Sequence, residues 1–266
     1  MNRVSRRKAL LVALIALIGG GLSYLFGVGS SLGQRAEASV LDASAFTFDP
    51  PPPLSLVSVP AVAIALLVIT ILAWIVHGAG RALWFAIFGF AAIAISQLLK
   101  QELLARPELF ELDAPNTFPS GHMTVFAIIS GGLIWAVPER WRAIVGLAAA
   151  VPMGTVAWQL LEYGWHRPSD VLGALALGVL TFALAAALRL PRRSRTVRVP
   201  SSASVALTKV LGAILTVAGV VIVAGGVILI AAAAGLGSDT LMLAASEISV
   251  VGVSALAARA MVTVSG

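Results

Sequence analysis

The chain has one polar turn that stands directly before an apolar run: Asn116-Thr117-Phe118-Pro119-Ser120-Gly121-His122. The apolar run that follows extends to Val137 and is predicted to be a helix that begins at this turn. A second turn of the same kind precedes another apolar run further along the chain: Trp165-His166-Arg167-Pro168-Ser169-Asp170. Ionisable groups at the ends of apolar segments are costly near lipid, so both turns are candidates for a functional site.

The composition is that of a polytopic membrane protein. The 266 residues are 59% hydrophobic and 11% charged, and their mean hydropathy is +0.99. Apolar runs of about 20 residues, the length that crosses a ~30 Å hydrocarbon layer, recur along the chain. The absence of cysteine excludes disulfides, thiolate nucleophiles and Cys-ligated metals. The net charge of +6 does not indicate nucleic-acid binding, because the basic residues flank apolar runs, as the positive-inside rule predicts.

The apolar runs predict the number of membrane helices. Seven runs are expected to span: 9–29, 54–76, 82–99, 122–137, 143–161, 171–188 and 210–236. Residues 241–264 are also apolar but carry Glu247 and Arg259, so whether they span is left open. The first run is interpreted as a membrane helix, with a cleaved signal peptide as the alternative. The predicted fold class is an all-α integral membrane protein, with a core of six transmembrane helices plus one or two additional C-terminal helices.

The segments between these runs divide the chain into four expected regions. These are a helix with an extracytoplasmic linker, the core that carries the motifs, a basic cytoplasmic linker and the C-terminal hydrophobic helices: 1–53, 54–190, 191–209 and 210–266. Residues 30–53 are predicted to be a loop outside the lipid, closed by Pro50 to Pro53, which cannot continue a helix. The arginine-rich segment 189–198 is interpreted as a cytoplasmic topology anchor.

The basic residues also predict the orientation of the chain. If the first six runs span and the amino terminus is cytoplasmic, the cytoplasmic side holds most of the arginines and lysines. The opposite side then holds only Arg35, Lys100, Arg106 and Arg167. Both polar turns lie on that non-cytoplasmic face. We therefore expect an integral protein of a bacterial plasma membrane, with an extracytoplasmic site.

Two histidines and one carboxylate in the turns suggest nucleophilic catalysis with general acid assistance. Asp170 follows His166 by four residues and can hold the imidazole ring in one tautomer. The same carboxylate would stabilise the imidazolium formed on attack. His122 could protonate a leaving oxygen, because the ordinary pKa of histidine is near the working pH.

The cations near these histidines indicate an anionic substrate. Lys100 and Arg106 supply positive charge for phosphate oxygens. Ser120 and the amide of Gly121 lie at a predicted helix start, where an anion is favoured, and Ser120 also suits a helix cap. Together with the histidines, these residues suggest phosphoryl transfer.

The same residues resemble the type 2 phosphatidic acid phosphatase superfamily of integral-membrane lipid phosphatases. That superfamily shares its motif architecture with bacterial acid phosphatases and vanadium haloperoxidases. The resemblance covers roughly residues 80–188 and rests on three signatures in order: Lys100…Arg106-Pro107, Pro119-Ser120-Gly121-His122 and His166…Asp170. It implies that His166 attacks phosphorus to form a phosphohistidine, that Asp170 orients it, and that His122 is the acid for the leaving group.

The resemblance also implies how the phosphoryl group is held. Lys100, Arg106, Ser120 and Gly121 would bind its oxygens, with no metal and no other cofactor required. The lysine of the first signature usually falls one residue earlier, at Leu99. On a continuous helix Lys100 and Arg106 would not share a face, so the backbone is expected to deviate before Pro107.

The third signature departs further from the pattern. Its usual Ser-Arg pair falls on Gln159 and Leu160, so a phosphate-binding arginine is missing from its expected place. Arg167, next to the nucleophile, is a candidate substitute. Loss of one charged donor would cost ~2–4 kcal/mol of transition-state stabilisation, or roughly two to three decades in rate.

The predicted function is hydrolysis of a lipid phosphate or a polyprenyl diphosphate at the non-cytoplasmic face. The expected partners are membrane lipid and this substrate, and no nucleic acid. The alternative is a non-catalytic membrane protein that binds or transfers a lipid phosphate with a degenerate site, motivated by Leu160. The substrate headgroup and the oligomeric state are left open by the sequence.

Overall fold

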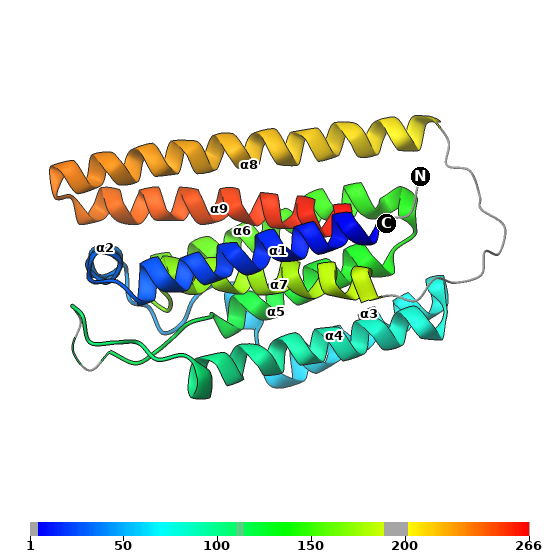
Figure 1. Ribbon diagram of the computed structural model, residues 1–266, viewed down its shortest axis with the longest axis horizontal. Coiled ribbons are helices and arrows are strands. Elements are labelled where there is room, and N and C mark those ends of the chain that lie inside the picture. Colours follow the sequence, from blue (N-terminus) through cyan, green and yellow to red (C-terminus); the bar gives the residue numbers. More distant parts are fainter. Residues whose placement is uncertain (1–4, 111, 113, 189–201, 266) are drawn as a thin grey trace.

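The fold is a bundle of long helices. The computed structural model describes residues 5–110, 112, 114–188 and 202–265, and every regular element in these ranges is a helix (Figure 1). Eight helices run side by side along one axis: α1 (Arg6–Ser23), α3 (Val59–His77), α4 (Ala79–Leu98), α5 (Gly121–Ala136), α6 (Arg142–Glu162), α7 (Pro168–Leu188), α8 (Ser202–Leu236) and α9 (Asp239–Val264). The prediction of an all-α integral membrane fold is confirmed.

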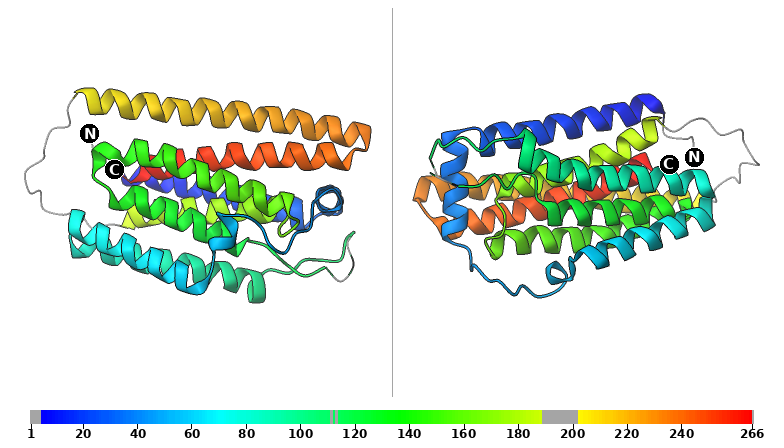
Figure 2. Two further views of the ribbon diagram at one scale, coloured as in Figure 1. Left: turned by 180° about the vertical axis from the view of Figure 1, so that it is seen from behind. Right: turned by 90° about the horizontal axis from the view of Figure 1, so that it is seen from below.

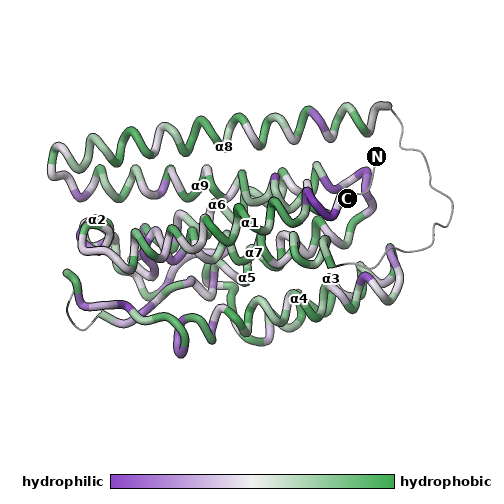
Figure 3. The backbone as a smooth tube through the Cα atoms, viewed as in Figure 1, coloured by the Kyte–Doolittle hydropathy of each residue, from purple (hydrophilic) through white to green (hydrophobic). Residues whose placement is uncertain are grey.

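Seven of these helices are long and apolar enough to cross a membrane. They are α1 with its π-helical extension to Val28, α3, α4, α6, α7, α8 and α9 (Figure 3 shows their hydropathy). Helix α9, whose role the sequence left open, therefore has the length and composition of a span. Helix α5 has 16 residues, or about 24 Å at 1.5 Å per residue, and is the short member of the bundle. The arginine-rich segment 189–198 lies outside the described residues.

Serine residues begin five of the helices. The side-chain oxygen of each serine accepts a hydrogen bond from the backbone N–H three residues later, at distances of 3.0–3.3 Å. These serines are Ser5, Ser30, Ser58, Ser120 and Ser238. Each cap satisfies one of the amides that a helix start leaves without an intrahelical partner. The capping function expected for Ser120 is thus present.

Small residues bring the other helices close to α5 at the centre of the bundle. A Cβ atom added at Gly131 would lie 2.1 Å from the ring of Phe182 on α7. One added at Gly132 would lie 2.4 Å from Phe85 on α4. Both contacts show that the large rings occupy the space that glycine leaves open. Close packing through small residues is the usual means of helix association in lipid.

The segment predicted to be a loop contains a further helix, α2 (Ser31–Asp42). The prediction for residues 30–53 is therefore wrong over this range. Ser30 caps the helix, and the prolines that forbid a helix begin only at Pro50. Helix α2 lies across one end of the bundle, nearly at right angles to the spanning helices (Figure 2, right). Its buried residues are Gln34, Glu37 and Val40, so the face toward the bundle is largely polar.

The two ends of the bundle differ in charge. The start of α1 and the end of α9 lie together at the end opposite α2 (Figure 1). The basic residues of the described segments at that end include Arg6, Arg7, Lys8, Arg81, Arg140, Arg142 and Lys209. Glu139 is the one acidic residue in those described segments. The α2 end holds both polar turns.

Candidate functional site

The two polar turns meet at the α2 end of the bundle, although they are far apart in the sequence. The backbone N–H of Ser120 donates to the backbone carbonyl of Asp170 at 3.0 Å, which joins the start of α5 to the first turn of α7. The ring centres of His122 and His166 lie 6.5 Å apart. The two imidazoles therefore flank one small volume. This arrangement brings together the histidines and the carboxylate that the sequence analysis selected.

Asp170 is fully buried, and its Oδ2 atom accepts three hydrogen bonds. The donors are Nδ1 of His166 at 3.1 Å, Oγ1 of Thr117 at 2.6 Å and the backbone N–H of Arg167 at 3.0 Å. The other carboxylate oxygen, Oδ1, has no hydrogen-bond partner among the described residues. Three donors that converge on one oxygen fix the orientation of the carboxylate.

This carboxylate determines which nitrogen of His166 is available for chemistry. The contact with Asp170 assigns the ring proton to Nδ1, an inference from the partner rather than an observed hydrogen. Nε2 then carries the lone pair. Only 7% of His166 is exposed, and the ring of Trp165 lies edge-on to His122 at 5.4 Å. The geometry is that of a nucleophile oriented by a third group, with a second imidazole nearby.

Arg167 points into the site. Its side chain is buried, and its NH1 atom donates to Oγ1 of Thr117 at 3.2 Å. The same hydroxyl donates to Asp170, so two successive hydrogen bonds through Thr117 join the guanidinium to the carboxylate that holds His166. The sequence could place Arg167 beside the nucleophile but could not show this direction. Arg167 is therefore in a position to offer charge to a bound anion.

The backbone deviation expected before Pro107 is present. Helix α4 continues into a π-helical turn, Leu99–Leu103, and the chain becomes extended at Leu104. The side-chain amide of Asn116 donates to the carbonyls of Lys100 (3.1 Å) and Leu104 (2.8 Å), which fixes this exit. Lys100 is close enough for its charge to act on Asp170. π-Helical turns are frequent at functional sites because they redirect side chains within a helix.

Arg106 is paired with a carboxylate that the sequence analysis did not select. Its NH1 atom lies 3.6 Å from Oε2 of Glu37 on α2, and the side chains are 2% and 6% exposed. Oε1 of Glu37 accepts a hydrogen bond from the backbone N–H of Ser169 at 3.0 Å. Burial raises the pKa of Glu37 above its ordinary value, and nearby Asp170 raises it further, while Ser169 and Arg106 act to lower it.

Gln34 holds the segment that carries Arg106 in place. Its Nε2 atom donates to the carbonyls of Val28 (2.8 Å) and Pro107 (2.6 Å), and its Oε1 atom accepts from the N–H of Phe110 (3.0 Å). Gln34 is fully buried. Helix α2 therefore attaches the first signature to the bundle through two polar side chains, Gln34 and Glu37.

Ser120 and Gly121 form the start of α5. The hydroxyl oxygen of Ser120 accepts from the N–H of Met123 at 3.2 Å, so it serves as the helix cap. A Cβ atom at Gly121 would lie 2.9 Å from Nε2 of Gln97, which places the Gln97 amide beside this turn. The amides of the first turn of α5 lie at the positive end of the helix dipole, where anions are favoured.

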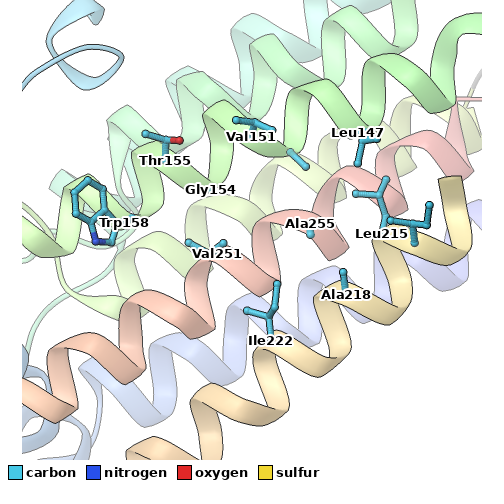
Figure 4. A pocket seen from close by; sticks show the side chains of 12 residues that line it. Leu147, Val151, Gly154, Thr155, Trp158, Leu215, Ala218, Ile222, Val251 and Ala255 are labelled. Atoms are coloured by element: carbon cyan, nitrogen blue, oxygen red, sulfur yellow. The ribbon is translucent and has the colours of Figure 1, made fainter.

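Other features of the bundle do not contribute to this site. His77, the third histidine, lies at the opposite end, with Nε2 3.2 Å from the carbonyl of Val137. An apolar groove of about 470 Å³ between α6, α8 and α9 is lined by none of the candidate residues (Figure 4). Trp158 and Thr155 are the lining residues with polar side-chain atoms. Within the described ranges, no group of three or more His, Asp or Glu side chains is placed to hold a metal ion.

The fold and the site define a polytopic membrane protein with a histidine–aspartate pair at one end of its bundle, beside buried cations. Residues 97–194 match the family model of the PAP2 superfamily. The matched segment carries both histidines and Asp170, and the match agrees with the family that the three signatures resemble. No curated protein and no solved structure matches this chain.

The structure shows what the two unusual residues of the third signature do. Gln159 is buried; its Oε1 atom accepts from the N–H of Leu54 (3.1 Å), and its Nε2 atom donates to the carbonyl of Pro51 (3.0 Å). It therefore anchors the proline-rich segment over α6. Leu160 is fully buried in the apolar core. The position where the superfamily pattern has an arginine contributes no charge here.

Proposed function

We propose that this protein is a membrane phosphatase that hydrolyses a lipid phosphate or a polyprenyl diphosphate through a phosphohistidine on His166. Superfamily membership and the membrane-spanning helices support a membrane phosphatase. The observation that carries the finer proposal is the 3.1 Å contact between Nδ1 of His166 and Oδ2 of Asp170, beside His122. A buried imidazole held in this way has one nitrogen free to attack phosphorus.

In the first step, Nε2 of His166 forms a bond to phosphorus while the bond from phosphorus to the leaving oxygen breaks. His122 takes up a proton as the anionic phosphoryl group binds, because the negative charge favours the imidazolium, and it donates this proton to the leaving oxygen, which departs as an alcohol or a phosphate. Asp170 stabilises the positive charge that develops on the His166 ring. Lys100, Arg106 and the amides of the first turn of α5 would bind the other phosphoryl oxygens, and Arg167 would stand in for the arginine missing at Leu160.

In the second step, a water molecule attacks the phosphohistidine. His122, now neutral, takes a proton from the water as its oxygen bonds to phosphorus. The bond between phosphorus and Nε2 breaks, and inorganic phosphate leaves. Both histidines then have the protonation states that they had in the substrate complex, so the cycle is balanced.

The proposed location follows from the charges at the two ends. We place the end with Arg6, Arg81 and Arg140 in the cytoplasm and the α2 end with the site outside it, in the plasma membrane of a bacterium. Because the chain has no cysteine, single cysteines report the sides directly. In whole cells, an impermeant maleimide should label Asp49→Cys and spare Glu139→Cys, and the reverse result would invert the topology.

The activity is tested by measuring phosphate release by the purified protein in the presence of a chelator. The panel contains phosphatidate, phosphatidylglycerol phosphate and polyprenyl diphosphates. Release should be lost in His166→Ala and kept in His77→Gln, a matched control at the opposite end of the bundle. Wild-type turnover by His166→Ala would rule out the phosphohistidine. When the reaction of wild type with ³²P-labelled substrate is quenched, it should also yield an acid-labile phosphoprotein, which His166→Ala should not form.

A second candidate function is binding or transfer of a lipid phosphate without turnover. Two observations favour it: Leu160 is buried and apolar, and Arg106 is paired with Glu37. Saturable binding of phosphatidate without phosphate release from any member of the panel would support this candidate over the phosphatase.

A further inference from the structure

Glu37 lies outside the segment that matches the superfamily, yet its carboxylate borders the candidate phosphate site. Oε1 is held by the N–H of Ser169, the residue before Asp170. Oε2 lies 3.6 Å from NH1 of Arg106 and has no hydrogen-bond partner among the described residues. One carboxylate oxygen is therefore anchored, and the other faces a guanidinium that the motif assigns to the phosphoryl group.

The side chain of Glu37 has little room to move away from Arg106. A Cβ atom at Gly27 would lie 2.9 Å from Oε1 of Glu37 and 2.5 Å from Cβ of Ser169, so the end of α1 packs directly against both. The hydroxyl of Ser23 donates to the carbonyl of Ser169 at 3.0 Å, which fastens the same contact. Glu37 is thus built into the wall of the site, where Arg106 is its partner.

The carboxylate changes the charge that a substrate meets. Among the described residues, Lys100, Arg106 and Arg167 are the cations at the site, and Glu37 and Asp170 are its carboxylates. An ionised Glu37 therefore removes one unit of positive charge from the site. The second negative charge of a phosphomonoester dianion would lie close to this carboxylate, which is unfavourable in a buried setting.

We propose that Glu37 selects the charge of the phosphoryl group, so that the site accepts a group with a single negative charge while Glu37 is ionised. This group is a phosphodiester or a monoester that keeps one proton. This selection rests on the proposed phosphatase function only because it requires the site to bind a phosphoryl group. Glu37 acts through Arg106 and is a specificity-determining residue, not a catalytic one.

The neighbours of Glu37 determine how this selection depends on pH. From the segment after α4 it faces Arg106, and from α7 it faces Ser169 and Asp170. Burial raises the pKa of Glu37, so the carboxylate takes up a proton more readily than an exposed glutamate as pH falls. A protonated Glu37 no longer places a negative charge beside Arg106, so the site should then tolerate a dianion. The selection should therefore become stronger as pH rises.

The test compares two non-hydrolysable lipids with the same alkyl chain: hexadecylphosphonic acid and its monomethyl ester. At about pH 9 the acid carries two negative charges and the ester carries one, and binding to the detergent-solubilised full chain is measured by calorimetry. Wild type should bind the ester at least as tightly as the dianion. Glu37→Gln keeps an oxygen for the N–H of Ser169 but removes the charge, and it should bind the dianion ~10-fold more tightly. Its affinity for the ester should change less than ~3-fold.

Two controls isolate the charge of Glu37. Asp42→Asn removes one negative charge from an exposed position on the same helix and should leave the ratio of the two affinities unchanged. Glu37→Asp keeps the charge and should keep the wild-type ratio. An unchanged ratio in Glu37→Gln would overturn the proposal. If Glu37→Gln does not fold, the wild-type affinities alone test the proposal. Binding of the dianion by wild type ~10-fold more tightly than the ester would overturn the charge selection.

These outcomes separate the two proposals. Loss of selection in Glu37→Gln without phosphate release from any lipid would support charge selection and reject the phosphatase. Phosphate release by wild type with equal ratios in wild type and Glu37→Gln would support the phosphatase and reject charge selection.

Discussion

Substitution of Asp170 by asparagine should separate the charge of this residue from its hydrogen bonds. All three donors converge on Oδ2, and Oδ1 has no partner among the described residues. An asparagine can therefore place its carbonyl oxygen at Oδ2 and its amide nitrogen at the position of Oδ1. The three hydrogen bonds remain, and only the negative charge is lost. Stability should fall by no more than ~1–3 kcal/mol, the cost of one buried amide without a partner.

The effect on catalysis should be much larger. In the proposed mechanism the carboxylate stabilises the charge that develops on His166, and removal of one such group costs ~2–4 kcal/mol, or ~10²–10³ in kcat. KM should change little, because Asp170 contacts His166 and not the substrate. Asp170→Ala is the less informative variant, since it leaves three buried donors unpaired at ~1–3 kcal/mol each.

The assay is phosphate release by wild type and Asp170→Asn, with thermal unfolding measured on the same preparations. A stable Asp170→Asn protein with kcat within ~3-fold of wild type would refute the electrostatic role of the carboxylate. A variant that unfolds would refute the hydrogen-bond assignment, because the asparagine was expected to preserve all three contacts.

Three further predictions follow from buried residues near the site. Because burial raises the pKa of Glu37, the folded protein loses stability as pH rises from about 4.5 through that raised pKa. Glu37→Gln lacks this loss, so the Tm of the variant minus the Tm of wild type should increase with pH. A difference in Tm that does not change with pH would contradict this. Gln159→Ala loses its hydrogen bonds to Leu54 and Pro51, so its free energy of unfolding in denaturant should be ~1–3 kcal/mol lower while kcat is unchanged. A lower kcat at unchanged stability would show that Gln159 takes part in catalysis. Leu160→Arg would bury a cation in the apolar core and should lower the Tm without restoring activity; a stable, faster enzyme would show that the site accepts the missing arginine.

The sequence predicted the helices and the contact between His166 and Asp170 because both depend on local patterns. Apolar runs of spanning length determine the bundle, and a serine before a run marks where a helix begins. His166 and Asp170 are four residues apart at the start of α7, so their contact needs little information from elsewhere in the chain. The count of spans also placed His122 on the same side of the membrane. These elements were predicted without knowledge of how the helices pack.

The rest of the site depends on contacts that no local pattern encodes. Thr117 was visible in the first polar turn, but its bond to Asp170 exists only because α5 and α7 begin side by side. Gln34 and Glu37 are polar residues three apart in a segment that its composition marked as a loop. The only local signal was the serine cap at Ser30, which indicates a helix but not the residues that it faces.

The charge of the phosphate site is the property that the signatures alone describe least well. Motif positions predict cations at Lys100 and Arg106, but the structure sets a carboxylate against Arg106 and an apolar core residue where another arginine is usual. Both changes lower the positive charge, and Arg167 offsets one of them. The residues that orient His166 for the proposed attack thus lie beside an anion site with less positive charge. Chemistry and binding then respond to different substitutions: a change at Asp170 should act on kcat, and a change at Glu37 should act on which anion is bound.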